Sequence, residues 1–397
     1  MKMKRITYLI VIILFAVTAS PQTTVLSIDS AVSLAIANFP QLKAAQLSVE
    51  KQRALKSSVL DLGTTGIYTG KEETGNGSPG IYNKIAIEQS DINILGAGAH
   101  SKLIKAQEYQ AKATLNLTRK NLIKETKSAW LDAVAAKKQF LLLQELDTVF
   151  VNFQQAAKLR YETQQCSKIE YLSATAKYKE IRMAVNSARN NYSAALQNLN
   201  YYLLLETEFD VDTNLKEVAY FEIKDSPEFS TVTNYYESNV KLAHSQWKSE
   251  RSAVLPKLNL AYKRQSIENE TGYHAWQVGI TAPLLFFAQS AKNKAAKIDY
   301  EIAEYEYRSM KMKISTGYKT LLNRYAMLKD AVDFYVNEAL PLADEQLKAA
   351  GLAYQSGNID YMQFIQNVES AVKIKQDYIM KQTGLQKVIA EIEFFTD

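Results

Sequence analysis

Glycine and proline are scarce in this sequence, with 14 and 7 among 397 residues. Both residues interrupt helices, so a long chain with few of them favours long helices over many short elements. Residues 97–162 contain no proline, and their one glycine is the second residue. A helix of that length would extend for about 100 Å, at about 1.5 Å per residue.

Cysteine and histidine are rarer still. Cys166 is the single cysteine, so no disulfide forms within the chain, and we interpret it as a packing residue rather than a redox group. His100, His244 and His274 lie far apart, form no HxxH or cysteine–histidine pattern, and are interpreted as ordinary surface or loop residues. With no glycine-rich phosphate loop or Ser/His/Asp order either, the sequence predicts no enzyme, no metal site and no cofactor.

The formal net charge is +5, and Lys2, Lys4 and Arg5 supply +3 of it. The near-neutral remainder argues against a nucleic-acid partner. An apolar stretch and two small residues follow these three basic residues, which predicts a signal peptide in residues 1–20, with an uncleaved anchor as the alternative. No later run is long and apolar enough for a helix that crosses a bilayer. Strands of a membrane barrel give weaker sequence signals and stay open as an alternative.

A pattern of helix, tyrosine, polar tip and helix occurs twice in the chain, at 154–179 and 346–372. Tyr161 aligns with Tyr354 at an offset of 193 residues, and the elements before each copy also correspond. A repeat of this length indicates a duplicated domain rather than a solenoid. We therefore predict repeats at 21–205 and 228–397, joined by a linker at 206–227.

Each repeat is predicted to contain a helical hairpin whose tip is the repeated stretch. The long helices should cover about 97–162 and 288–356, and the return helices about 166–201 and 360–394. The second long helix has apolar residues at alternating steps of four and three, which indicates a coiled-coil seam. The seam residues are Ile314, Tyr318, Leu321, Tyr325, Leu328, Val332, Tyr335, Ala339 and Leu342. Because the pattern continues across Pro341, we expect that proline to kink the helix without ending it.

Strand pairs are predicted at about 60–95 and 256–284, because apolar and polar residues alternate there with period two. Turn-rich stretches at 75–80 and 268–272 should form the loops of the two pairs. Four strands cannot close a barrel by themselves and would leave exposed edges. The predicted fold is thus mainly α with a small β part: two repeats of long coiled-coil hairpins plus four strands per chain.

Several segments resemble the TolC-type outer-membrane efflux proteins, also called outer membrane factors. They are "LSIDSAVSLAIANFPQLKAAQLSVE" (26–50), "VLPKL" (254–258), "APLLFFAQSAKNKAAK" (282–297) and "LAYQSGNIDYMQFI" (352–365). The resemblance implies a homotrimer in which three chains supply four strands each to a 12-stranded outer-membrane barrel. It also implies that the helices form a periplasmic tube, whose tips meet a periplasmic adaptor protein linked to an inner-membrane pump.

The function implied by this resemblance is a passive exit duct for small molecules or metal cations. The segment 282–297 is similar to the branch that serves heavy-metal pumps of the resistance–nodulation–division type. A drug or small-molecule pump is the nearest competitor, and a duct for type I protein secretion is the third. The alternative from another class is a secreted periplasmic coiled-coil scaffold without a pore, which would have no need of the four strands.

The resemblance also assigns candidate site residues. Those for the periplasmic tip and adaptor docking are Tyr161, Gln164, Ser167, Tyr354, Gly357 and Asp360. Those for the lining of the aperture are Glu170, Gln363 and Gln366. Gln164 stands where the second tip has Gly357, so the first tip departs from the family pattern. Trp276 is predicted to be an anchor at the membrane interface, because it lies beside a turn-rich loop, and a packed strand residue is the alternative.

Overall fold

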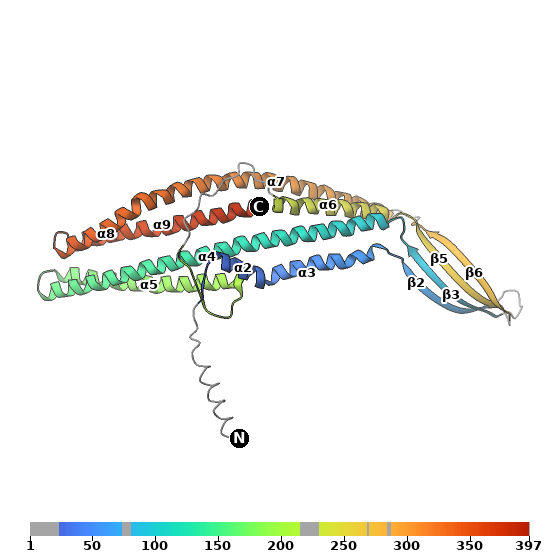
Figure 1. Ribbon diagram of the computed structural model, residues 1–397, viewed down its shortest axis with the longest axis horizontal. Coiled ribbons are helices and arrows are strands. Elements are labelled where there is room, and N and C mark those ends of the chain that lie inside the picture. Colours follow the sequence, from blue (N-terminus) through green and yellow to red (C-terminus); the bar gives the residue numbers. More distant parts are fainter. Residues whose placement is uncertain (1–23, 74–80, 215–229, 268–269, 284–286, 397) are drawn as a thin grey trace, which may run out of the picture. The chain divides into compact units, whose positions relative to one another are not determined.

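The computed structural model describes residues 24–73, 81–214, 230–267, 270–283 and 287–396 (Figure 1). The predicted signal peptide and the loop at 75–80 lie outside the described residues, as do parts of the linker and of the second loop. The elements are β1 (Thr24–Leu26), α2 (Ile28–Asn38), α3 (Pro40–Ala54), the 3-10 helix η1 (Leu55–Val59), β2 (Thr64–Glu73), β3 (Ile81–Ile92), α4 (Ala97–Glu162), α5 (Lys168–Leu203), β4 (Phe209–Val211), α6 (Ser230–Ser252), β5 (Lys257–Ile267), β6 (Glu270–Thr281), α7 (Phe287–Phe334), the π-helix η2 (Tyr335–Ala339), α8 (Leu340–Gln355) and α9 (Tyr361–Phe395). The mainly helical fold with a small β part is therefore confirmed.

The chain divides into two compact units, and each unit draws on both halves of the sequence. The first comprises Met1–Phe39, Asn121–Asp225 and Thr320–Phe394, and the second comprises the remaining segments. The two long helical paths, α4 and α7, contribute to both units.

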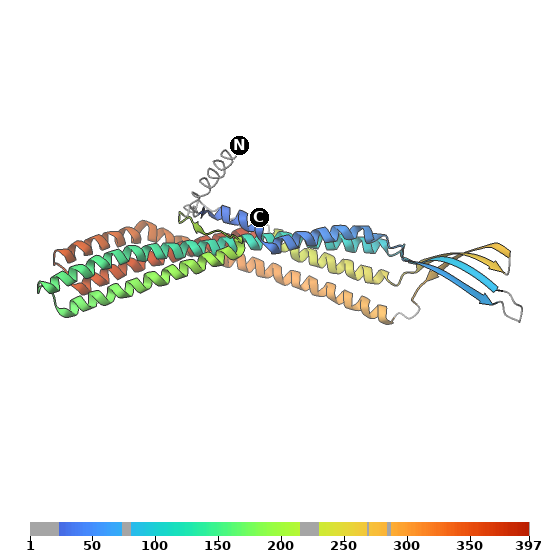
Figure 2. The same cartoon turned by 90° about the horizontal axis from the view of Figure 1, so that it is seen from below.

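The first unit contains two helical hairpins. The later part of α4 runs beside α5, and α8 runs beside α9, in both views of the molecule (Figures 1 and 2). Apolar side chains from all four helices pack into one cluster. Its fully or almost fully buried members include Phe150, Ala157, Ala174, Val368 and Ala350. Burial of this stripe stabilises helices that would be marginal alone.

The helical path through Pro341 continues, as the sequence predicts. The five residues Tyr335–Ala339 form a π-helical turn that ends two positions before the proline. Leu340 N donates to Tyr335 O. Proline has no N–H and its ring crowds the carbonyl four residues earlier, and this wider turn relieves both problems. The prediction for Leu342 was wrong: its side chain is 64% exposed, and Ala343 is buried instead. The extra residue in the π-turn shifts the seam by one position.

A small parallel sheet was not predicted. Strand β1 pairs with β4, with Leu26 opposite Val211. Two side chains of α4 hold this sheet: Trp130 Nε1 donates to Leu26 O at 3.0 Å, and Lys137 Nζ donates to Val211 O at 2.8 Å. Lys137 also forms an ion pair with Asp210 at 2.7 Å. The sheet therefore fastens two chain segments to the hairpin of the first unit.

The second unit contains a four-stranded antiparallel sheet in the order β2-β3-β5-β6. The two predicted strand pairs thus join through β3 and β5. A bulge in β3 places Asp91 at φ 61°, and Asp91 N donates to the Asn259 side chain at 2.7 Å. Strands β2 and β6 form the two edges.

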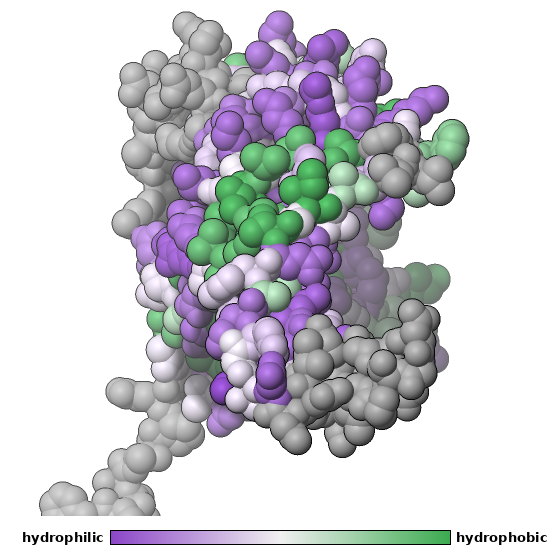
Figure 3. All heavy atoms as spheres, turned by 90° about the vertical axis from the view of Figure 1, so that its right-hand side faces the viewer, coloured by the Kyte–Doolittle hydropathy of each residue, from purple (hydrophilic) through white to green (hydrophobic). Residues whose placement is uncertain are grey.

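The two faces of this sheet differ in polarity, as the alternation predicts. Residues directly opposite one another share a face, and one row reads Ile67, Ile87, Tyr262 and Trp276. The neighbouring row on the other face reads Gly66, Glu88, Ala261 and Gln277. Side chains of the apolar face are largely exposed, at 74% for Ile67 and 80% for Trp276. A space-filling view toward the sheet shows apolar residues gathered among polar ones (Figure 3).

Among the helices of the described part, none has a stretch that is both long enough and apolar enough to cross a membrane.

Candidate functional site

The first hairpin tip joins α4 to α5 within the first unit. Thr163 N donates to Leu159 O at 2.9 Å, and Gln165 N donates to Arg160 O at 2.7 Å. Gln164, between them, has a φ of 59°, in the left-handed region that side chains other than glycine rarely adopt. These bonds satisfy carbonyl groups that the end of a helix leaves unpaired.

The second tip repeats this turn 193 residues later. Ser356 N donates to Leu352 O at 3.0 Å, and Asn358 N donates to Ala353 O at 2.8 Å. Gly357 has a φ of 73°, which glycine adopts without steric strain. The departure at Gln164 therefore leaves the backbone turn unchanged.

Both return helices begin with a side-chain cap. Ser167 Oγ accepts a hydrogen bond from Glu170 N at 3.1 Å. The Asp360 carboxylate accepts from Gln363 N at 2.8 Å, and the Gln363 side-chain oxygen accepts from Asp360 N at 3.1 Å. The second tip has a complete capping box, whereas the first has only half of one. The spacing S-x-x-E and D-x-x-Q could have revealed both caps in the sequence.

The Glu170 side chain does not complete a capping box with the backbone N–H of Ser167, because it bridges the two hairpins instead. Its Oε1 lies 3.4 Å from Arg160 Nη1 and accepts a hydrogen bond from Tyr354 OH at 3.1 Å. Arg160 also lies over the Tyr354 ring, 5.3 Å from its centroid. Burial, followed by the negative charge of Glu170, raises the pKa of Tyr354 to about 12. The tyrosine therefore remains a neutral donor at physiological pH.

Arg160 was not among the residues predicted for this site. It lies on the first tip where the second tip has Ala353, and this charge difference between the repeats was the available signal. We call Arg160, Glu170 and Tyr354 the tip bridge. Within the described residues it joins α4, α5 and α8.

The other candidate residues lie apart from the bridge. Tyr161 is 38% exposed and stacks on Tyr171, with ring centroids 5.6 Å apart. The Gln363 side chain is engaged in its cap, and Gln366 is exposed on α9. Their role at an aperture remains a prediction.

An aromatic cluster packs against the helices that form the second tip. Phe153 of α4 is 5% exposed. Its ring centroid lies 4.9 Å from that of Tyr354, 5.3 Å from that of Tyr361 and 4.8 Å from that of Phe364. Phe153 thus ties the first hairpin to the second, and no local sequence pattern pointed to this contact.

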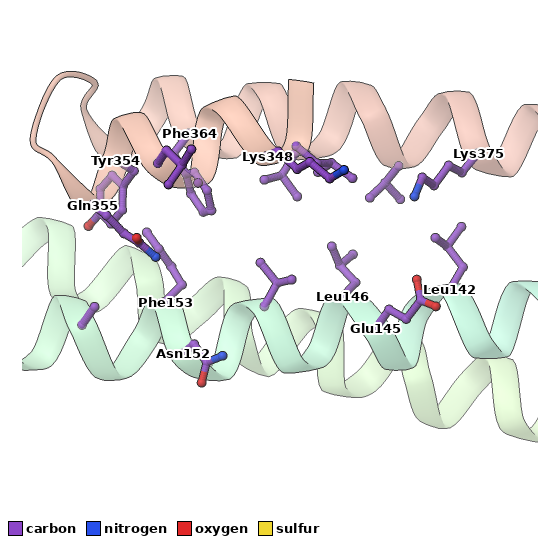
Figure 4. Close-up of a pocket in the computed structure, with 17 residues that line it drawn as sticks. Leu142, Glu145, Leu146, Asn152, Phe153, Lys348, Tyr354, Gln355, Phe364 and Lys375 are labelled. Carbon is purple, nitrogen blue, oxygen red and sulfur yellow. The ribbon is translucent and has the colours of Figure 1, made fainter. Parts of the chain in front are cut away.

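A groove next to this cluster separates α4 from α8 and α9 (Figure 4). Its volume is about 640 Å³, and its walls are mostly apolar, with Leu146 and Phe153 on one side and Phe364 on the other. Lys348 and Glu145 add charge to the lining. The two hairpins are therefore closely joined near the tips, with open space beside that junction.

The described cysteine and histidine residues lie in separate environments. Cys166 Sγ donates to Ala157 O at 3.5 Å, and burial raises the pKa of its thiol. His244 lies in α6 beside Tyr300, with ring centroids 5.2 Å apart, and burial lowers its pKa. His100 lies in α4 and His274 in β6, so none of the three described histidines is in a loop. In the part of the chain that the structure describes, no group of three or more His, Cys, Asp or Glu could hold a metal ion.

Trp276 lies near the middle of β6, where its ring packs against Tyr262 with centroids 4.6 Å apart. The sequence had suggested a position close to the loop. Its role as an interface anchor remains a prediction, and its central position places it within the apolar face instead of at the end of the strand.

Comparisons with known proteins agree with this geometry. Residues 236–390 match the family model described as outer membrane efflux protein. Similar solved structures include CusC, VceC from Vibrio cholerae and MtrE from Neisseria gonorrhoeae. Their identities to this chain are 12%, 13% and 16%, with TM-scores of 0.78, 0.75 and 0.76. The matches cover 94%, 93% and 93% of this chain, and 93%, 95% and 88% of those chains, respectively. No curated protein matches the chain.

The fold is therefore that of the outer-membrane efflux channels. Residues 236–390, which are 155 of the 397 residues, are similar to the outer membrane efflux protein family.

Proposed function

We propose that the chain is the outer-membrane exit duct of a tripartite efflux system. Three copies would each give four strands to a 12-stranded barrel, and their helices would form a tube in the periplasm. The duct would be passive, and an inner-membrane pump would supply the energy through a periplasmic adaptor. The exported substrates would be small molecules or metal cations, with a pump of the resistance–nodulation–division type as the favoured partner.

The four-stranded sheet is the observation that carries this proposal. Its strands are 10 to 12 residues long, close to the 9–11 residues or so that cross a bilayer as tilted strands. One face presents exposed apolar side chains, and β2 and β6 are edges that require partners. Pairing these edges between copies would close the sheet and place the apolar face toward lipid.

The two tips would form the periplasmic entrance. The tip bridge links the hairpins of one chain, while the neighbouring groove leaves room for them to change their separation. Opening would then be an outward shift of the segments 161–170 and 354–366, stabilised by contact with the adaptor. In this scheme the resting entrance depends on the Glu170 hydrogen bond and ion pair.

Single-channel conductance in a planar bilayer tests the proposal. Wild type should conduct with a preference for cations. Glu170→Gln should reduce this preference, because it leaves Arg160 without its counter-charge at the entrance. Glu162→Gln is the matched control: it removes a carboxylate near the same tip, where Glu162 is exposed and lies 3.8 Å from Lys158.

The outcomes separate the duct from its alternative. A protein that is soluble without detergent and never conducts would contradict the duct and favour the coiled-coil scaffold. Equal ion selectivity in wild type and Glu170→Gln would be compatible with the duct, but it would show that Glu170 does not set the selectivity of the entrance.

A further inference from the structure

The charge of this chain is concentrated next to the sheet. The eleven-residue segments 51–61, 97–107, 246–256 and 287–297 contain ten Lys or Arg residues and two Asp or Glu residues. Their net charge is +8, whereas the whole chain carries +5. The rest of the chain therefore has a net charge of −3, and the basic character of the protein resides in these four segments.

The topology brings the four segments to one end of the sheet. Thr64, which begins β2, pairs with Ser90 near the end of β3, and Lys257, which begins β5, pairs with Thr281 at the end of β6. Ile92 and Leu258 pair at the same end. Helices α3 and α6 enter the sheet there, and α4 and α7 leave it there. All four segments belong to the second unit. We call them the basic collar.

The basic side chains of the collar are available to a partner. All ten are exposed. In the described part of the chain, only Arg53, Lys56 and Lys297 among them form ion pairs. Lys102 and Lys105 lie five and eight residues after the start of α4, which is about 8 and 12 Å along the helix.

Apolar residues lie at the ends of the collar segments and in the connections beside the strands. Leu60, Leu62, Ile94, Leu95 and Phe287 are 54–85% exposed although each adjoins a helix or strand end. From the sheet outward, the surface thus changes from apolar strands to apolar connections and then to cations. A phospholipid leaflet has the same order, with hydrocarbon followed by a headgroup layer that is about 5–8 Å thick.

We propose that the basic collar binds the phosphate-bearing headgroups of anionic phospholipids in the leaflet nearest the helices. This inference rests on the proposed insertion of the sheet in the outer membrane. Lysine and arginine near an anionic surface attract it over about a Debye length. The collar would fix how deeply the sheet enters the bilayer, and it would give the protein a preference among lipids.

Competition between two labelled lipids tests this proposal. The purified mature protein is reconstituted in vesicles that contain phosphatidylcholine and phosphatidylglycerol, one of which is brominated. Quenching of tryptophan fluorescence gives the relative binding constant of the two lipids. The chain has three tryptophans, of which Trp247 lies in the collar and Trp276 on the apolar face.

The collar variant carries Lys102→Gln, Lys105→Gln, Lys292→Gln and Lys294→Gln. Its control carries Lys179→Gln, Lys311→Gln, Lys313→Gln and Lys319→Gln, which change the net charge equally at exposed lysines that lie outside the collar. Wild type and control should prefer phosphatidylglycerol, and added salt should weaken the preference. In the collar variant, the preference for phosphatidylglycerol should fall at least roughly tenfold.

Three outcomes would count against the proposal or its premise. Equal binding of both lipids by wild type would contradict headgroup binding by the collar, but it would not contradict the proposed duct. An equal loss in the control variant would also overturn it, because net charge and not the collar would be responsible. Failure of wild type to insert into any vesicle would instead contradict the proposed duct.

Discussion

The two hairpin tips have the same backbone turn but different side-chain support. Their hydrogen bonds match one for one at an offset of 193 residues, including those of Thr163 and Ser356. The second tip has glycine in the left-handed position, a complete capping box and the Phe153 cluster. The first has Gln164, half a capping box and the charges of the tip bridge. Turn geometry is thus set by backbone hydrogen bonds, which allows the side chains to take different tasks.

The largest expected effect is the loss of the aromatic support of the second tip. Phe153→Ala should destabilise the hairpins by about 3–5 kcal/mol, because it opens a cavity among three aromatic rings. Tyr161→Ala at the first tip should change stability by only about 0.5 kcal/mol, since Tyr161 is exposed. Thermal unfolding of the purified protein measures both. Equal effects would mean that the two tips are supported alike.

Substitutions at the two residues with left-handed backbone conformation should change the stability in opposite directions. Gly357→Ala should destabilise the protein by about 1–2 kcal/mol through backbone strain alone, because a Cβ at this position meets no atom within 4 Å. Gln164→Gly should stabilise it by a smaller amount, because relief of strain is partly offset by a more flexible unfolded chain. The same unfolding measurement applies. A stabilising Gly357→Ala would show that this φ is not retained in solution.

Removal of the helix cap should also cost more stability at the second tip than at the first. Asp360→Ala should cost about 1–2 kcal/mol, because it removes the hydrogen bond from Gln363 N and the negative charge that favours a helix N-terminus. Ser167→Ala should cost about 0.5–1 kcal/mol, because it breaks one bond. Hydrogen exchange of the amides of Gln363 and Glu170 would locate each effect, and an equal loss at both tips would contradict the comparison.

The tip bridge should weaken at alkaline pH. The pKa of Tyr354 is raised from 10.0 to about 12, so the folded state favours the neutral tyrosine. This contribution to stability is complete below pH 10 and is lost as the pH rises toward 12. Tyr354→Phe should lose less stability than wild type over this interval. Denaturant unfolding across the interval tests it, and parallel losses in the two proteins would exclude Tyr354 as the source.

Much of the fold could be predicted because it depends on local periodicity. The helix Ala97–Glu162 has the predicted ends, since glycine, turn residues and caps mark them in the sequence. The polar and apolar faces of the strands were readable for the same reason. The parallel pair β1–β4 escaped notice because three-residue strands are too short to show alternation.

The candidate site was less accessible to sequence analysis. The positions of the tips followed from the repeat, but the bond between Tyr354 and Glu170 joins residues 184 positions apart. Phe153 likewise acts through residues of another hairpin. Such contacts depend on how helices face one another, and a local pattern carries no information about that.

The π-turn before Pro341 has a consequence for the way the two repeats diverged. Trp130 corresponds to Tyr318 at an offset of 188, whereas the tips correspond at 193, so the second long helix has five additional residues. Five residues would rotate an α-helix by about 500°, or 140° beyond a full turn. The π-turn absorbs one residue, and the other four leave a rotation error of only about 40°. A helix can therefore change length during evolution and still present the same face at its tip.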